Sequence, residues 1–216
     1  MAETLSEQML RENAGLFKEM ITHRFVEEIK RDELPSAVFD RYLVYEGAFV
    51  ETAISIFAYA VAKADTIAQR RWLISVLDAL ANEQIAYFEN TLAERGIDPT
   101  SFDVGRPEVE AFRSGMLAIA REGTFLDIIA AMFAAEWMYW TWSAEAARRK
   151  ISDPSLKEWV DMHAHKKFAG QARRLRHALD AAGEQLDPIE RKRLSKVFGE
   201  VQQLEIVFHN AAYLSR

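Results

Sequence analysis

Three glutamates lie where the sequence predicts the buried faces of helices: Glu46, Glu136 and Glu205. Residues three or four positions apart share one helix face, and each of these acids falls within a stripe of apolar residues with that spacing. A buried carboxylate is costly, tends to have a raised pKa, and is seldom retained without a partner or a task. We therefore predict a site for acid/base chemistry, built from acids of three different helices.

The apolar setting is most complete around Glu136. The segment 128–142 is apolar on every side of a helix, and Tyr139 is its only other ionisable residue, which predicts a central helix. The aromatic residues near the three acids are Tyr42, Tyr45, Phe49, Phe112, Trp137, Tyr139, Trp140 and Trp142. Such residues are typical of a core, but a cavity lined by them and by a few carboxylates would also suit a flat heterocycle that bears nitrogen.

Two alternatives to an acid/base site stay open. Each glutamate could extend its carboxylate to solvent or pair with an arginine. The acids could also bind metal, because Glu19 with His23, and Glu205 with His209, are four residues apart and share a helix face. The Glu-x-x-His pattern of paired-metal helical sites is absent from the sequence. We predict no metal and no cofactor.

Among the remaining histidines, His163 is the better candidate for a site. It follows Trp159 by one helical turn on the stripe expected to face inward. His165 lies two residues further on, so the two side chains diverge on a helix. We expect His165 and His177 at the surface.

The elements that must position these residues are helices. Periodicity of about 3.6 residues recurs along nearly the whole chain, and no segment alternates polar with β-branched or aromatic residues as a strand does. We predict an all-α bundle of about seven to eight helices in a single domain, residues 1–216. The expected ranges are 5–31, 36–62, 66–95, 107–121, 125–149, a sixth helix from 154, and 188–214.

Local sequence signals support several of these boundaries. Thr66 with Gln69 has the pattern of a capping box, in which two orphan amides at a helix start are satisfied reciprocally. Asp187 followed by Pro188 and Glu190 combines a capping residue, proline at the first helical position, and a carboxylate three residues after the cap. Other expected boundaries lie at Pro35, Gly96, Gly123 and the Thr124–Asp127 pair.

Composition excludes several function classes. The formal net charge of −6 argues against nonspecific binding of nucleic acid, which needs a positive field. The sequence has no cysteine, which removes disulfides, thiolate ligands and cysteine nucleophiles. The longest apolar run, 53–62, is about half of the roughly 20 residues that cross a bilayer. No signal-peptide pattern opens the chain, so we expect a cytoplasmic protein that binds neither membrane nor nucleic acid.

The order of these residues resembles the TenA (thiaminase II) family along nearly the whole chain. The similarity is carried by His23-Arg24-Phe25-Val26, Leu34-Pro35, Phe39, Tyr42-Leu43, Glu46, Gly123-Thr124-Phe125-Leu126, Glu136-Trp137-Met138-Tyr139, Phe198, Glu205 and Phe208. The resemblance implies a heme-oxygenase-like helical bundle, a homo-oligomer (dimer or tetramer), and hydrolysis of aminopyrimidines in thiamin salvage or cleavage of thiamin itself.

The resemblance also implies roles for particular residues. The family nucleophile is a cysteine, whose position falls on Ala135 here. The family's proton-transferring glutamate matches Glu205, and a tyrosine one turn after the cysteine matches Tyr139. The pyrimidine-binding aspartate corresponds to Glu46.

Three tyrosines that frame the ring in the family correspond to Phe49, Phe112 and His163. A similar branch of the family lacks the cysteine and uses an alternative glutamate, for which Glu136 is the candidate here. The lost hydroxyls at Phe49 and Phe112 would change which heterocycle the site discriminates.

The sequence thus favours a cysteine-independent hydrolase of an aminopyrimidine or a related small amine. In this hypothesis Glu205 and Glu136 are catalytic, and Glu46, Tyr139, Phe49, Phe112 and His163 bind the substrate. One alternative is a small-molecule-binding or regulatory protein that has lost turnover, and another is a metal-dependent oxidase on the same bundle.

Overall fold

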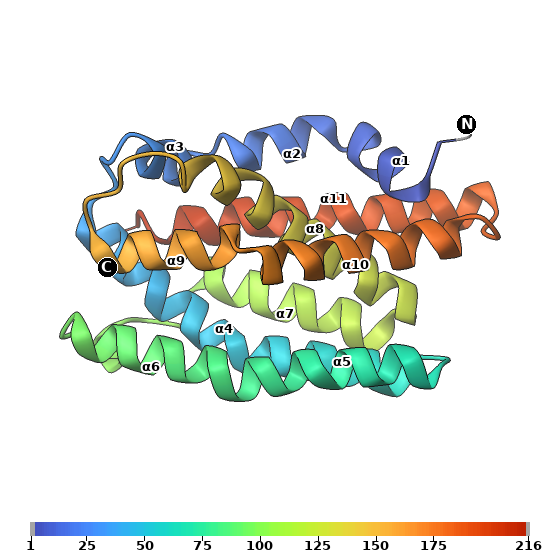
Figure 1. Ribbon diagram of the computed structural model, residues 1–216, viewed down its shortest axis with the longest axis horizontal. Helices are drawn as coiled ribbons and strands as arrows, with labels where there is room; N and C mark the ends of the chain where they lie inside the picture. The colour runs from blue at the N-terminus through green and yellow to red at the C-terminus, as the bar shows by residue number, and fades with distance from the viewer. Residues whose placement is uncertain (1–2, 215–216) are drawn as a thin grey trace. The chain divides into compact units, whose positions relative to one another are not determined.

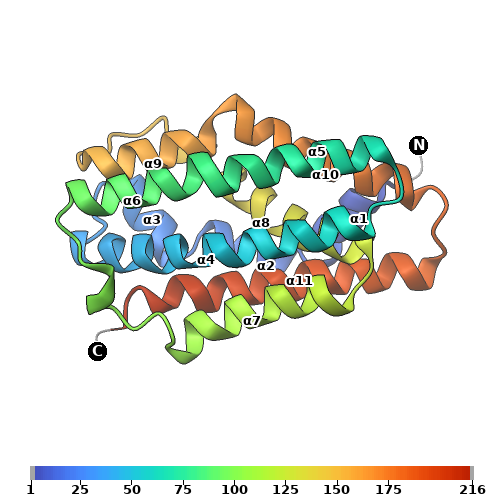
Figure 2. The same ribbon diagram turned by 90° about the horizontal axis from the view of Figure 1, so that it is seen from below.

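The computed structural model describes residues 3–214, and within that range the chain forms only helices and the turns that join them (Figures 1 and 2). The chain divides into two compact units, each made from two separate stretches of sequence. Unit 1 comprises the residues up to Leu34 together with Ile129–Ile206, and unit 2 comprises Pro35–Ile128 together with the residues from Val207 onward. The single domain expected from the sequence stays a prediction.

Unit 1 carries the short N-terminal helices and most of the long helices of the second half. Its helices are α1 (Leu5–Glu12), α2 (Ala14–Ile21), α3 (Arg24–Lys30), most of α8 (Phe125–Ala146), α9 (Pro154–Ala164), α10 (Lys166–Gly183) and most of α11 (Pro188–Ala211). Helix α1 packs on α10, and α10 on α9. The residues of α8 from Ile128 to Ala135 are all at least nine-tenths buried, so α8 is a core helix as predicted.

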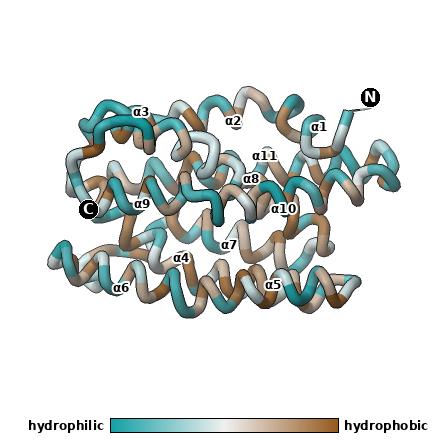
Figure 3. The backbone as a smooth tube through the Cα atoms, viewed as in Figure 1, coloured by the Kyte–Doolittle hydropathy of each residue, from teal (hydrophilic) through white to brown (hydrophobic). Residues whose placement is uncertain are grey.

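Unit 2 is built around α4 (Ser36–Lys63), which packs against α5, α6 and α7. Its other elements are α5 (Ile67–Ala79), a π-helical turn η1 (Leu80–Gln84), α6 (Ile85–Glu94), a short 3₁₀ turn η2 (Pro99–Ser101) and α7 (Pro107–Glu122). In the part of the chain that the structure describes, α4 is the one helix long and apolar enough to cross a membrane by length and composition, and 44% of its most apolar window is buried. A core helix passes the same test. Figure 3 shows hydrophobic and hydrophilic residues alternating along the helices, as expected for helices with one buried face.

Several predicted helix boundaries are confirmed. Thr66 forms a capping box with Gln69 at the start of α5, and the carboxylate of Asp187 accepts the amide of Glu190 at the start of α11. Gly96 ends the α5–α6 segment with a φ of +65°, a left-handed conformation that glycine adopts without steric cost. The predicted helix 66–95 therefore exists, with the π-helical turn in its middle.

The prediction of one helix over 5–31 is wrong, because polar side chains interrupt it twice. Asn13 leaves helical geometry (φ −107°, ψ 19°), and its amide donates to the carbonyls of Met9 and Ser195 at 2.9 Å each. His23 caps α3 by accepting the amide of Phe25 at its Nδ1. Side chains that bond nearby backbone groups compete with helix continuation, and periodicity alone does not reveal them. The sixth predicted helix is divided in the same way at His165, which caps α10.

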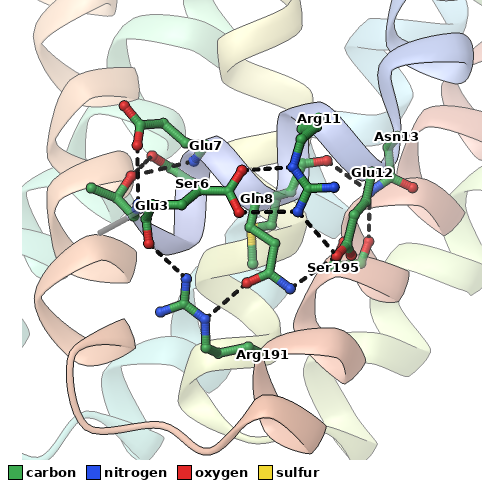
Figure 4. Close-up of polar contacts among 11 residues, drawn as sticks. Glu3, Ser6, Glu7, Gln8, Arg11, Glu12, Asn13, Arg191 and Ser195 are labelled. Carbon is green, nitrogen blue, oxygen red and sulfur yellow. Dashed lines mark hydrogen bonds and ion pairs between the residues drawn. The ribbon is translucent and has the colours of Figure 1, made fainter. Parts of the chain in front are cut away.

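The start of α11 is fixed to α1 by a polar network (Figure 4). Arg191 donates to the side chain of Gln8 at 2.8 Å and to the carbonyl of Glu3 at 3.0 Å. One turn further, Ser195 receives the amide of Asn13. These contacts set the axial position of α11 within unit 1, and hence the height of the residues that follow on this helix.

Candidate functional site

The three acids are buried as the sequence predicts. Glu46 is 8% exposed, Glu136 9% and Glu205 1%. Glu136 and Glu205 belong to unit 1, on α8 and α11, whereas Glu46 belongs to unit 2, on α4. Convergence of all three acids on one cavity therefore stays a prediction.

Glu136 is an acid that burial keeps protonated. Loss of solvation raises the pKa of its carboxyl group to about 8, and a smaller opposing effect comes from hydrogen bonding with Gln171 on α10. Within residues 3–214, its Oε2 atom is buried and has no hydrogen-bond partner. At neutral pH the group is thus predominantly a neutral acid that can give up a proton.

Glu205 is linked to α8 through Tyr139. The tyrosine hydroxyl donates to Oε2 of Glu205 at 3.4 Å, in a fully enclosed contact. Tyr139 follows Glu136 by three residues, so the two side chains are neighbours on one face of α8. The predicted pair of catalytic acids and Tyr139 therefore belong to one cluster of unit 1, whose middle member is the tyrosine.

His163 is 4% exposed, so it faces inward as predicted, and it lies beside Tyr139. The two rings are 5.2 Å apart between centroids, and Trp159 lies 4.4 Å from the imidazole. Burial lowers the pKa of His163 to about 4, while the contact of Nδ1 with the Trp159 carbonyl at 2.8 Å acts in the opposite direction. Since a carbonyl only accepts, Nδ1 carries the proton of the neutral ring and Nε2 is an acceptor. His165 and His177 are exposed, as expected.

Four residues on one face of α8 are slightly exposed, although less so than Trp137 and Trp140, which are intermediate in burial. Met132, Ala135, Glu136 and Tyr139 are 6–9% exposed, whereas Ala134 and Met138 are 0% exposed. The four partly exposed residues are spaced by three and four, so they share a face. Ala135, where the family resemblance places a cysteine, is thus on the same face as Glu136 and Tyr139.

The predicted aromatic residues of unit 2 also come together. The ring of Phe112 lies between those of Phe49 and Phe208, at 4.6 Å from each centroid. Tyr42 packs edge-on against Phe208 at 5.7 Å. Glu46 lies between Tyr42 and Phe49 in the sequence of α4, and Tyr42, Phe112 and Phe208 are at least nine-tenths buried, so these rings belong to the core of unit 2. Their part in binding a flat ring stays a prediction.

Two glutamines of unit 1 were not found by sequence reasoning. Gln171 contributes to the environment of Glu136. Gln202 precedes Glu205 by three residues, is 0% exposed, and donates from Nε2 to the carbonyl of Ala134 at 2.8 Å. A buried amide within the apolar stripe of α11 was the available signal, because glutamine is mostly an exposed residue.

A groove is lined by residues other than those of this cluster. An open groove of about 710 Å³ lies over the first turns of α11 and the junction of α1 and α2. It is lined by Glu12, Asn13, Pro188, Ile189, Lys192, Arg193, Ser195 and Lys196, none of which is a predicted site residue. Across residues 3–214 the structure brings together no group of three or more histidines and acids that could hold a metal ion.

Comparisons with known proteins find a family model and several relatives that match this chain. The model of the TENA/THI-4/PQQC family matches residues 11–215. An aminopyrimidine aminohydrolase of Halalkalibacterium halodurans is 24% identical over 198 residues, which cover 90% of this chain and 88% of that protein. An aminopyrimidine aminohydrolase of Helicobacter pylori is 22% identical over 213 residues, covering 96% and 98%.

Solved structures confirm the predicted fold. A TenA homologue from Pyrococcus furiosus superimposes with a TM-score of 0.89 at 23% identity, covering 97% of this chain and all of that one. A protein of heme-oxygenase-like fold from Shewanella denitrificans gives a TM-score of 0.74 at 14% identity, covering 95% and 90%. The all-α, heme-oxygenase-like architecture is therefore established for this chain.

Proposed function

Since this chain belongs to the TENA/THI-4/PQQC family, we propose that it is a cysteine-independent hydrolase that releases ammonia from an aminopyrimidine or a related small heterocyclic amine. The observation that carries the proposal is the cluster of Glu136, Tyr139 and Glu205 in unit 1. Two relatives named aminopyrimidine aminohydrolase support the reaction class.

The chemistry divides between the two acids. In this proposal Glu205, which accepts a hydrogen bond from Tyr139, is the general base that takes a proton from a water molecule. Glu136, whose pKa burial raises to about 8, holds the proton that the departing amine needs. Water oxygen bonds to the carbon as the C–N bond breaks; the water proton passes to Glu205, and the proton of Glu136 passes to nitrogen. Return of a proton from Glu205 to Glu136 resets the site.

This division explains how a chain without a thiol could work. A cysteine nucleophile would occupy position 135, where this sequence has alanine. Direct attack by water needs only a base and an acid on the two sides of the reacting bond, and each typically contributes about 10²–10⁴-fold to the rate. His163, which is neutral and lies beside Tyr139 in the same unit, would bind the ring. The binding roles of Glu46, Phe49 and Phe112, which belong to unit 2, stay predictions.

The test is release of ammonia from aminomethyl-pyrimidines, followed in a coupled assay with purified protein. We expect turnover by the wild type and a loss of about 10²-fold or more in Glu205→Gln and in Glu136→Gln. Glu200→Gln is the matched control, because Glu200 is an exposed acid on the same helix, paired with Lys196. Equal rates in the wild type and in Glu205→Gln would remove the proposal, and calorimetric binding without product would identify a binding protein instead.

A further inference from the structure

Gln202 is a buried amide whose hydrogen bonding does little for stability. Its Nε2 donates to the carbonyl of Ala134 at 2.8 Å, but a carbonyl inside a helix already accepts the amide four residues on. Its Oε1 is buried and has no partner within residues 3–214. An unsatisfied buried acceptor is costly, so an apolar side chain of similar size would serve a core better. The burial of this amide therefore calls for an explanation other than stability.

The orientation of the amide follows from its partner. A carbonyl oxygen only accepts, so the nitrogen of Gln202 must face Ala134 and the oxygen must face away. The contact therefore joins a definite point of α11 to a definite point of α8. That point on α8 directly precedes Ala135 and Glu136.

A second hydrogen bond between these helices joins Tyr139 to Glu205, in addition to the ring contact of Phe133 with Phe198. Along α8 the two hydrogen bonds are five residues apart, about 7.5 Å, and along α11 three residues apart, about 4.5 Å. Ala135 and Glu136 lie on α8 between the two hydrogen bonds. Nearer the start of α11, Arg191 and Ser195 bind this helix to the N-terminal helices (Figure 4). A shift of α11 that separates Glu205 from Tyr139 would also have to break the bond of Gln202.

We propose that Gln202 is a positioning residue, which sets the register of α11 on α8 so that the carboxylate of Glu205 lies at the hydroxyl of Tyr139. Its action on turnover rests on the proposed function of the Glu136–Glu205 cluster. Its action on geometry does not, which allows the two to be tested separately. A displacement of about 1 Å at a catalytic group is enough to cost about 10²-fold in rate.

The geometric test is a double-mutant cycle in thermal unfolding. Gln202→Met keeps the volume of the side chain and removes both of its polar atoms. Tyr139→Phe removes the hydroxyl that donates a hydrogen bond to Glu205. If Gln202 positions Glu205, the fall in Tm caused by Tyr139→Phe will be smaller in the Gln202→Met background than in the wild type. Gln203→Met is the matched control, since Gln203 is the exposed neighbour on the same helix, and its cycle with Tyr139→Phe should be additive.

The kinetic test uses the same variants. We expect Gln202→Met to lower kcat at least tenfold with KM and Tm equal to or above those of the wild type, while Gln203→Met leaves kcat within twofold. Additive Tm shifts in the Gln202 cycle, or a kcat that falls only as Tm falls, would overturn the positioning role. A wild type without any turnover, combined with a non-additive Gln202 cycle, would refute the proposed function and leave the positioning role intact.

Discussion

Replacing Glu136 by glutamine should make the protein more stable above pH 5, and increasingly so up to pH 8. In the folded protein, burial raises the pKa of this carboxyl group to about 8, whereas an unfolded chain has an ordinary value of about 4.3. Between these values the folded state holds a proton that the unfolded state has released. Stability therefore falls as pH rises through this window, by about 1.4 kcal/mol per pH unit, and is level on either side of it.

The magnitude at a given pH follows from the distance to the unfolded pKa. At pH 7 the penalty is on the order of 3–4 kcal/mol, and above pH 8 on the order of 5 kcal/mol. Glutamine has the same shape and does not titrate, so Glu136→Gln removes the whole pH-dependent penalty. For a chain of this length, each kcal/mol corresponds to about 2–4 °C in Tm.

The assay is urea unfolding followed by tryptophan fluorescence, to which the buried Trp142 and Trp159 contribute, at intervals from pH 5 to pH 9. The free energies of unfolding of wild type and Glu136→Gln should diverge with pH and become parallel above pH 8. Glu200→Gln should run parallel to the wild type over the same range, because Glu200 is exposed. If the difference between wild type and Glu136→Gln stays constant across the range, the carboxyl group is not held protonated and the acid role falls with it.

Three further changes have definite outcomes. His163→Asn should reduce the loss of stability at acid pH. Burial lowers the pKa of His163 to about 4, so the wild type should lose on the order of 3 kcal/mol of unfolding free energy as pH falls from about 6.5 to 4, measured by denaturant titration. The same loss in the variant as in the wild type would contradict this. Gly123→Ala should lower Tm by several degrees, because the added Cβ would lie 2.6 Å from the carbonyl oxygen of Ile119; a Tm equal to wild type would show that α7 yields there. Thr66→Ala should cost about 1 kcal/mol in urea unfolding by removing the capping box of α5, whereas the exposed neighbour change Ile67→Ala should cost less.

The sequence predicted those parts of the molecule that depend on local patterns. The start of α5 at Thr66 and that of α11 at Asp187 were predictable because a cap is a contact within four residues. The burial of Glu205 was predictable because its neighbours on the helix face are apolar. Both inferences need only residues that lie close together in the chain.

What the sequence missed depends on partners far along the chain. The break at Asn13 is stabilised by Ser195, 182 residues away, and the orientation of Gln202 by Ala134, 68 residues away. Neither partner can be identified from spacing within one helix. The role of Gln171 beside Glu136 was hidden for the same reason, since α10 and α8 meet only in the folded unit.

The π-helical turn at Leu80–Gln84 affects how this chain should be aligned with its relatives. A π turn holds one residue more than an α turn, and the extra residue is accommodated within the turn itself. The residues of α5 and α6 that face the core therefore stay the same with or without it. Deleting a single residue within this turn would restore ordinary winding without rotating α6 relative to α5. Homologous chains can therefore be one residue shorter here while Trp72 and Phe88, buried on either side, keep their places in the core.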